Sequence, residues 1–251
     1  MTSPDFPTWN VASRSDTGLI RPRNEDRCGA FENTSGAHLF VVADGMGGHR
    51  GGATASRIAV DSLATALTQA ETDSGSSDVS GAWLTSAIRA TNREVYAAAA
   101  NDAELNGMGT TLVAVLVAAS GDAWVAHVGD SRAYLLRNGV LEALTEDHSV
   151  VAEMLRRGLI TPEEAESHPR RNEILRSVGI EPDVEPELSE LDLRPGDRVL
   201  LCSDGLCGVV PAADLEQLLA AQAPAQAVES IVEAANERGG PDNVTALLVQ
   251  T

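Results

Sequence analysis

Residues 110–144 of the chain read TTLVAVLVAASGDAWVAHVGDSRAYLLRNGVLEAL, a stretch in which short apolar runs alternate with turn signals. The runs at 112–118 and 124–128 are separated by Ser120-Gly121-Asp122, which is typical of a turn. The next two runs flank Asn138-Gly139, the dipeptide with the strongest preference for a tight hairpin. Strands joined in sequence by such short turns predict an antiparallel sheet.

Elements of the same kinds lie on both sides of this stretch. Further apolar runs of strand length occur at 38–43, 198–202 and 244–249. Apolar residues at helical spacing predict two pairs of helices, at 53–70 with 83–100 and at 211–221 with 225–238, and further helical structure at 149–178. The polar, low-complexity segment 71–81 is predicted to be a loop. Because helical and strand regions are segregated, we expect an α+β fold with sheet packed between helical layers.

Charge and composition exclude several functions. The 251-residue chain has a net charge of −19, and all 18 of its basic residues are arginine. Without lysine, a Walker-type phosphate loop, a protein kinase site and Schiff-base catalysis are excluded. The acidic balance argues against nucleic acid or an anionic membrane as a partner, because such binding needs clustered positive charge.

Cysteine content and the amino terminus indicate the compartment. The chain has only three cysteines, Cys28, Cys202 and Cys207, which are too few for a disulfide framework. The first residues have neither the basic nor the apolar region of a signal peptide, and no apolar run approaches the roughly 18 residues of a membrane span. We therefore expect a cytoplasmic protein without a membrane anchor.

Aspartates recur where predicted strands begin or end. Asp44, Asp130 and Asp204 follow apolar runs, and Asp242 precedes one, each beside glycine or another small residue. A single Asp-Gly after a strand is usually only a turn. If these strand ends share one edge, however, the carboxylates repel one another unless a cation neutralises them. Ligands that are all oxygen favour Mg²⁺ or Mn²⁺, and two such ions suit an in-line displacement at phosphorus.

Arg21 is the candidate for binding the anion that a metal pair would act on. With no lysine present, a guanidinium must supply this contact, and its geometry suits phosphate oxygens. The alternative is a surface arginine in a solvated ion pair. Cysteine-phosphatase and phosphoaspartate signatures are absent from the sequence, and His127 and His148 are interpreted as structural.

The ordered motifs of the chain resemble those of the metal-dependent protein Ser/Thr phosphatases of type 2C, in their bacterial branch. The matching segments are Ser15–Asp26, Val42–His49, Gly107–Thr111, His127–Arg132, Cys202–Leu206 and Gly240–Thr245. The resemblance implies one catalytic domain over 1–251, with a flap at about 148–176. It also implies a β-sandwich of two mostly antiparallel sheets, flanked on each side by an antiparallel pair of helices.

The resemblance also implies a metal centre of two core ions and a third, Mn²⁺ or Mg²⁺. Asp44 would bridge the two core ions, and the carbonyl of Gly45 would bind the first. Asp204 and Asp242 would complete the second, while Asp130 and Asp204 would hold the third.

Three further positions match family residues around this centre. Glu25 and Asp26 would support the metal-bound waters, and Arg21 would bind the substrate phosphate. Animal relatives carry a histidine where this chain has Met46, which cannot donate a proton. Protonation of the leaving group would therefore fall to a metal-bound water or another group.

The expected activity is hydrolysis of phosphoserine and phosphothreonine in proteins by a metal-activated water, without a phosphoenzyme intermediate. The expected substrates are phosphorylated proteins, with a Ser/Thr kinase and its targets as natural candidates, and the expected enzyme is a monomer. Two alternatives remain open: a phosphatase for small phosphoesters, and a metal-binding regulator without catalysis.

Overall fold

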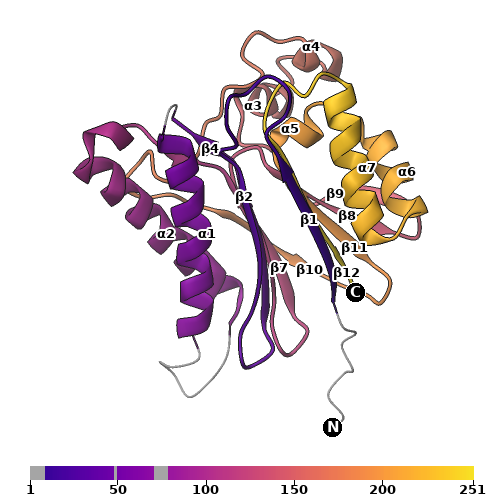
Figure 1. Ribbon diagram of the computed structural model, residues 1–251, viewed down its shortest axis with the longest axis horizontal. Coiled ribbons are helices and arrows are strands. Elements are labelled where there is room, and N and C mark those ends of the chain that lie inside the picture. Colours follow the sequence, from indigo (N-terminus) through magenta and orange to yellow (C-terminus); the bar gives the residue numbers. More distant parts are fainter. Residues whose placement is uncertain (1–8, 48–49, 71–78) are drawn as a thin grey trace.

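The computed structural model describes residues 9–47, 50–70 and 79–251, and two five-stranded antiparallel sheets form its centre (Figure 1). One sheet has the order β1 (Asn10–Asp16), β12 (Val244–Gln250), β11 (Arg198–Cys202), β8 (Arg132–Arg137), β9 (Val140–Ala143). The other has the order β10 (Glu187–Leu191), β7 (Ala123–Val128), β6 (Leu112–Val117), β3 (His38–Ala43), β2 (Arg27–Glu32). A short ladder pairs β4 (Gly45–Met46) with β5 (Gly109–Thr110).

The central strands are apolar throughout because both of their faces are buried. In β3, Phe40 and Val42 belong to the core between the two sheets, whereas Leu39 and Val41 pack toward helices on the outer face. Successive side chains of a strand point to opposite faces, so each central strand contributes to two cores at once. The result is three stacked apolar layers that hold the strand ends in fixed positions.

Two pairs of helices cover the outer faces of the sandwich (Figure 1). The helices α1 (Gly51–Gln69) and α2 (Gly81–Asn101) pack on the sheet that contains β3, and η1 (Ala103–Leu105) follows them. The helices α6 (Ala212–Ala221) and α7 (Pro224–Glu237) pack on the other sheet, after the short α5 (Asp204–Cys207). The predicted α+β sandwich with flanking helix pairs is therefore confirmed.

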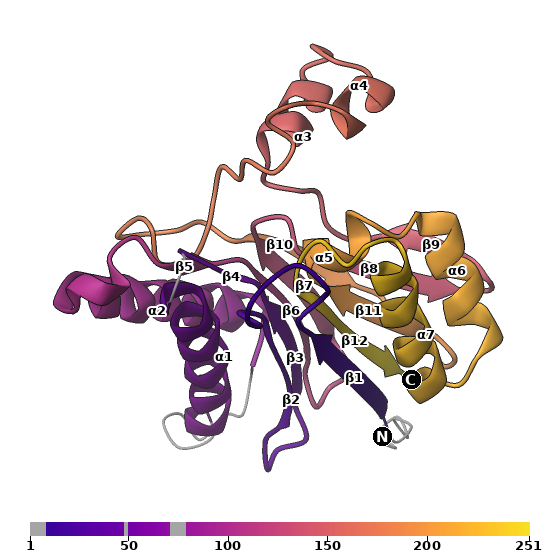
Figure 2. The same cartoon turned by 45° about the horizontal axis from the view of Figure 1, so that its top comes forward.

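The segment 148–176 stands away from the sandwich (Figure 2). It contains α3 (Val150–Arg156) and α4 (Pro162–Glu166). The predicted start of α4 is confirmed, because Thr161 and Glu164 form a capping box with proline next in sequence. The expectation of helix across 149–178 is only partly right, since the chain beyond α4 is irregular. An isolated bridge between Ser149 and Ile174 joins the two ends of the segment, and a second one pairs Val178 with Thr110 of β5.

The predicted β8–β9 hairpin is also present. Asn138 and Gly139 both have positive φ angles, 53° and 80°, as a type I′ turn requires. Most of the predicted loop at 71–81 lies outside the described residues. Among the helices of the described ranges, none has the length and apolarity to cross a membrane.

Candidate active site

A cavity of about 500 Å³ opens at one end of the sandwich. Its walls include seven of the eight residues that the sequence singled out: Arg21, Glu25, Asp44, Gly45, Asp130, Asp204 and Asp242. The eighth, Asp26, is buried and only 6% exposed. Its carboxylate accepts a hydrogen bond from Ser203, which directly precedes Asp204.

Antiparallel pairing explains why these aspartates meet. In an antiparallel pair, the end of one strand lies beside the start of its partner. Asp204 follows β11 and Asp242 shortly precedes β12, its partner in the sheet. Asp26 precedes β2 and Asp44 follows β3, and the flanking residues Arg27 and Ala43 are register partners. Strand pairing thus brings aspartates that are far apart in the sequence to the same end of the sandwich.

The backbone beside the aspartates is packed too closely for side chains. A Cβ atom added to Gly45 would lie 2.2 Å from the carbonyl oxygen of Gly52. A Cβ atom added to Gly205 would lie 2.0 Å from the carbonyl oxygen of Asn243. Glycine after Asp44 and Asp204 therefore allows the loops that carry these carboxylates to approach neighbouring segments.

Asp26 is buried and Asp44, Asp130 and Asp204 are half-buried, and lost hydration together with neighbouring negative charge raises the pKa values of these groups. Burial, reinforced by the charges of Asp26 and Asp204, raises the pKa of Asp44 well above its ordinary value. Burial raises the pKa of Asp26 to about 6. Burial and the charge of Asp204 raise the pKa of Asp130 to about 7. The site by itself therefore holds negative charge at considerable cost in free energy.

Two buried carboxylate oxygens in the described part of the chain accept no hydrogen bond, Oδ1 of Asp26 and Oδ1 of Asp204. An unpaired buried carboxylate is strongly unfavourable unless a cation accompanies it. The surrounding donor set is all oxygen, as hard divalent ions such as Mg²⁺ and Mn²⁺ prefer. The residues present therefore fit a centre for such ions.

Arg21 lies at the mouth of the cavity. Its Nη2 donates a hydrogen bond of 2.7 Å to Oδ2 of Asp242, and its side chain is 53% exposed. The loop before it is fixed where Gly18 adopts a φ of 73° and the N–H of Leu19 donates to the carbonyl of Gly240. Arg21 is thus an exposed cation, held by one carboxylate, beside a pocket of carboxylates.

Asn243 organises the loop beside the site, a role that was not predicted from the sequence. Its Nδ2 donates to the carbonyls of Thr17 and Arg23, at 2.9 Å each. Its Oδ1 accepts from the N–H of Glu25 at 2.8 Å. This one amide therefore fixes the loop that carries Arg21. The only sequence evidence that could have identified Asn243 is its position within the motif Gly240–Thr245.

The segment 148–176 also reaches the cavity. Asn172 and Ile174 line it, together with Met46 and Thr111. Nothing in the local sequence around Asn172 marks it as a site residue, because only the folding back of the segment brings it there. The resemblance implied a flap at about 148–176, but neither Asn172 nor Ile174 was predicted as a site residue.

A second group of possible ligand atoms lies outside this cavity. Among the described residues, His127, His148 and Glu187 each offer a donor atom, and these atoms lie within 4.8 Å of one another. The two histidines are buried and Glu187 is exposed.

Comparisons with known proteins agree with this arrangement. The family profile described as Protein phosphatase 2C matches residues 21–248. The chain is 44% identical over 238 residues to the Serine/threonine phosphatase stp of Listeria innocua, which covers 94% of each protein. It is also 44% identical to the Serine/threonine protein phosphatase PstP of Mycobacterium tuberculosis over 94% of its own length and 44% of that protein.

Solved structures are similar over nearly the whole chain. The crystal structure of the Mycobacterium tuberculosis phosphatase PstP/Ppp has a TM-score of 0.86 at 41% identity, and covers 96% of this chain and 98% of that one. The PstP catalytic domain in complex with two manganese ions has a TM-score of 0.84 at 40% identity, over 96% and 97%. Because fold, motif order and profile agree over nearly its full length, the chain belongs to the protein phosphatase 2C family.

Proposed function

We propose that this protein hydrolyses phosphoserine and phosphothreonine in phosphorylated proteins, with Mn²⁺ or Mg²⁺ as cofactor. One observation carries the proposal: the cavity is walled by half-buried carboxylates, among them Asp204 with an unpaired buried oxygen, with the unpaired Oδ1 of Asp26 behind the wall and the exposed Arg21 in the lining. The family supports the same reaction, since the similar proteins from Listeria innocua and Mycobacterium tuberculosis are named serine/threonine phosphatases.

The ligands are assigned to residues that already surround the cavity. Asp44 and the carbonyl of Gly45 would hold the first core ion, and Asp44, Asp204 and Asp242 would hold the second. Asp130 and Asp204 would hold a third. In support, the structurally similar catalytic domain of PstP forms a complex with two manganese ions. Bound ions of this kind lower the pKa of a coordinated water and neutralise charge at the phosphoryl group.

The protein's own groups orient the substrate and the waters. The Arg21 guanidinium binds the phosphate oxygens, for which its fork of N–H donors is suited. Its exposure allows it to exchange Asp242 for the substrate. Glu25 and Asp26 accept hydrogen bonds from waters of the centre, and the unpaired Oδ1 of Asp26 is available for this.

We infer that the chain is one catalytic domain and that the segment 148–176 is its flap. Asn172 and Ile174 of this segment line the cavity, so they are placed to contact the chain on either side of the phosphorylated residue. Phosphoproteins, among them a Ser/Thr kinase and its targets, are the substrates we expect. The three free cysteines are in keeping with a reducing compartment, the cytoplasm.

The test is release of phosphate from a phosphothreonine peptide and from p-nitrophenyl phosphate, with added Mn²⁺ and with EDTA. We expect Mn²⁺-dependent hydrolysis of the peptide that EDTA abolishes. Activity that persists in EDTA would overturn the proposed mechanism. Efficient turnover of small phosphoesters without peptide turnover would show a metabolite phosphatase instead.

A further inference from the structure

His148 joins the foot of segment 148–176 to the turn that carries Asp130. Its backbone N–H donates to the carbonyl of Gly129 at 3.0 Å. Its ring Nδ1 accepts a hydrogen bond of 3.2 Å from the N–H of Gly129. Its own carbonyl accepts from the N–H of Leu175 at 2.7 Å, where the segment returns. One residue thus binds both peptide groups of Gly129 and both ends of the segment.

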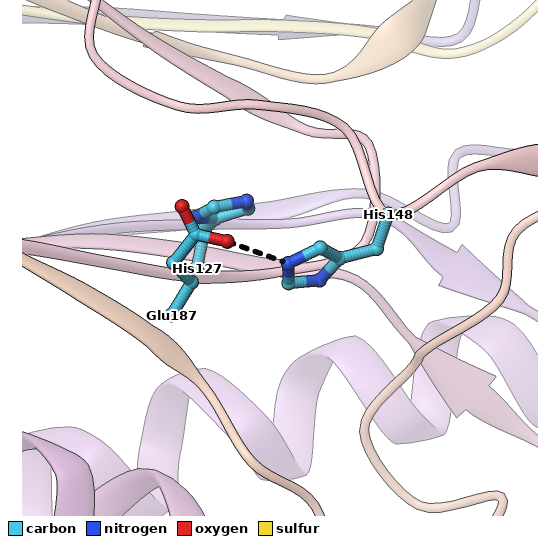
Figure 3. A group of neighbouring side chains, drawn as sticks. All are labelled: His127, His148 and Glu187. Carbon is cyan, nitrogen blue, oxygen red and sulfur yellow. Dashed lines mark hydrogen bonds and ion pairs between the residues drawn. The ribbon is translucent and has the colours of Figure 1, made fainter. Parts of the chain in front are cut away.

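The far side of the ring is also occupied (Figure 3). Nε2 of His148 lies 3.4 Å from Oε2 of Glu187, and the ring stacks on His127 with centroids 4.4 Å apart. Because Nδ1 accepts, a neutral ring must carry its proton on Nε2, which donates to Glu187. Burial and the neighbouring His127 and Arg176 lower the pKa of His148 to about 4, so the ring is neutral at physiological pH.

This hydrogen bonding argues against a metal ion at the His127, His148 and Glu187 group. Two histidines and a glutamate are a known ligand set for zinc. Coordination through Nε2 of His148 would, however, move its proton to Nδ1, where the N–H of Gly129 already points. Nη1 of Arg176 also lies 3.5 Å from Nε2, and a cation there disfavours a second one. The group is better described as a chain of hydrogen bonds from Glu187 through His148 to Gly129.

Gly129 has a conformation that residues with a side chain rarely adopt. Its φ is 106°, and a Cβ atom added to it would lie 2.8 Å from Cβ of Thr111. The next residue is Asp130, so the peptide between them sets the direction in which that carboxylate leaves the turn. The same two segments are also joined by an ion pair. Both oxygens of Asp147, which precedes His148, accept hydrogen bonds from Arg132, at 2.7 and 2.8 Å.

We propose that His148 is a positioning residue that holds the Gly129–Asp130 turn so that Asp130 faces the carboxylate cavity. The inference rests on the third-ion role proposed above for Asp130. It links the segment 148–176 to that ion through one imidazole. Loss of the ring would leave the fold in place and let the Asp130 carboxylate turn away from its ligand position.

The test compares side chains that keep or lose the acceptor facing Gly129. In His148→Asn, the amide oxygen can replace Nδ1, whereas in His148→Gln the amide lies one bond further out, near the place of Nε2. His148→Leu removes both functions. His168→Leu is the matched control, because Nδ1 of His168 also accepts a backbone N–H, that of Arg170, but His168 does not line the cavity.

The readout is Mn²⁺ binding by calorimetry, with thermal unfolding to show that each variant is folded. We expect the Gln and Leu variants to bind the weakest Mn²⁺ ion at least roughly ten-fold less tightly, as is typical when a group that orients a ligand is lost. The two tighter ions should be unaffected. The Asn variant and His168→Leu should resemble wild type. If the Leu variant does not fold, the difference in Mn²⁺ affinity between the Asn and Gln variants tests the positioning role.

Asp130→Asn separates the two levels of the argument. If it loses the weakest ion while His148→Gln and His148→Leu retain wild-type binding, the positioning role is wrong and the proposed function stands. If Asp130→Asn binds all ions normally, the third-ion role of Asp130 fails, and this inference fails with it.

The tautomer can be measured directly. We expect the ¹⁵N spectrum of the histidine rings to show His148 protonated on Nε2 at pH 7, before and after addition of Zn²⁺. Tight Zn²⁺ binding that shifts the His127 and His148 signals together, and is lost in His127→Ala, would show a metal site and overturn the hydrogen-bonded assignment.

Discussion

Aspartates shielded from solvent occur in two regions of this protein, and the regions differ in how the negative charge is balanced. Asp197 is 2% exposed, yet both of its oxygens accept hydrogen bonds from Arg137, and the N–H of Arg194 donates to it. Burial alone would raise its pKa, but these bonds outweigh burial and lower it. Asp44 and Asp204, at the other site, have raised pKa values and face further carboxylates.

The difference shows that a buried aspartate with a purely structural role is paired with an arginine in this protein. Arginine is available for that purpose at Arg137 and Arg132, each paired bidentately with an aspartate. Among the described residues, the arginines that line the cavity are Arg21 and Arg23, and both are exposed. Bound metal ions would therefore balance the negative charge of the cavity. Mutation of the cavity aspartates should reduce activity, whereas mutation at the Arg137–Asp197 pair should reduce stability.

The largest effect is expected at Asp44. Asp44→Asn should reduce Mn²⁺-dependent activity by at least ~10³-fold, since loss of even one stabilising group in an active site costs 10²–10³. The same change should stabilise the metal-free protein by about 1–3 kcal/mol, because it removes a desolvated negative charge that faces Asp26, Asp204 and Asp130. Phosphate release and thermal unfolding in EDTA measure the two effects. Loss of activity together with loss of metal-free stability would contradict this assignment.

Arg21→Ala should act on the substrate and leave the fold intact. We expect KM for a phosphothreonine peptide to rise by roughly 10- to 100-fold, the value of a charge-assisted contact. Stability should change by less than about 1 kcal/mol, because the pair with Asp242 is exposed. Steady-state kinetics and unfolding check both. An unchanged KM with a collapsed kcat would contradict the phosphate-binding role.

Arg137→Met should show the reverse pattern. It leaves the Asp197 carboxylate buried without its main partner, which should cost about 2 kcal/mol or more. For a chain of this size we expect Tm to fall by roughly 4–8 °C. Mn²⁺ affinity and KM should equal those of wild type, since neither residue lines the cavity. A change in ion binding would show that the two regions are coupled.

The smallest effect is a dependence of metal-free stability on pH. A carboxyl group with a higher pKa in the folded than in the unfolded chain keeps its proton longer when folded, so stability falls as pH rises between the two values. For Asp26 and Asp130, with pKa values of about 6 and about 7, this window extends from near pH 4 to pH 7.

Unfolding in EDTA should therefore show Tm decreasing by a few degrees across that window, at roughly 2–4 °C per kcal/mol. Asp197 acts in the opposite sense, since its lowered pKa gives stability that is lost only as pH falls below about 4. Asp130→Asn should flatten the slope between pH 5 and 7, and an unchanged slope would exclude Asp130 as its source.

Much of the fold was predictable because the central strands carry strong signals. Segments 38–43 and 198–202 coincide with β3 and β11, whose residues are buried on both faces. In the two five-stranded sheets, the strands that were not predicted from the sequence, β1, β2 and β10, lie at the edges, and the two-residue strands β4 and β5 were also not predicted. An edge strand is half exposed and reads as polar, so it lacks the apolar run by which strands are recognised.

The residues of the site also divide into those that could be predicted from the sequence and those that could not. Asp44 and Asp204 could be found because each follows a strong strand signal. Asn243 lies in a motif that the sequence marked, but its role could not be assigned there, and Asn172 has no local signal. Both roles depend on loops that approach from elsewhere in the chain. Spacing along the chain identifies ligands on strands, whereas the residues that hold the loops become visible only in three dimensions.

The amide of Asn243 has a consequence for biosynthesis. It fixes Thr17 and Arg23, which leave the ribosome more than two hundred residues earlier, and β12 lies between β1 and β11 in its sheet. Domains are made from the amino terminus onward, and contacts between distant segments form late. A nascent chain therefore displays most of its motifs long before it has a closed site. We expect phosphatase activity to begin only at the last strand, so that incomplete chains dephosphorylate nothing.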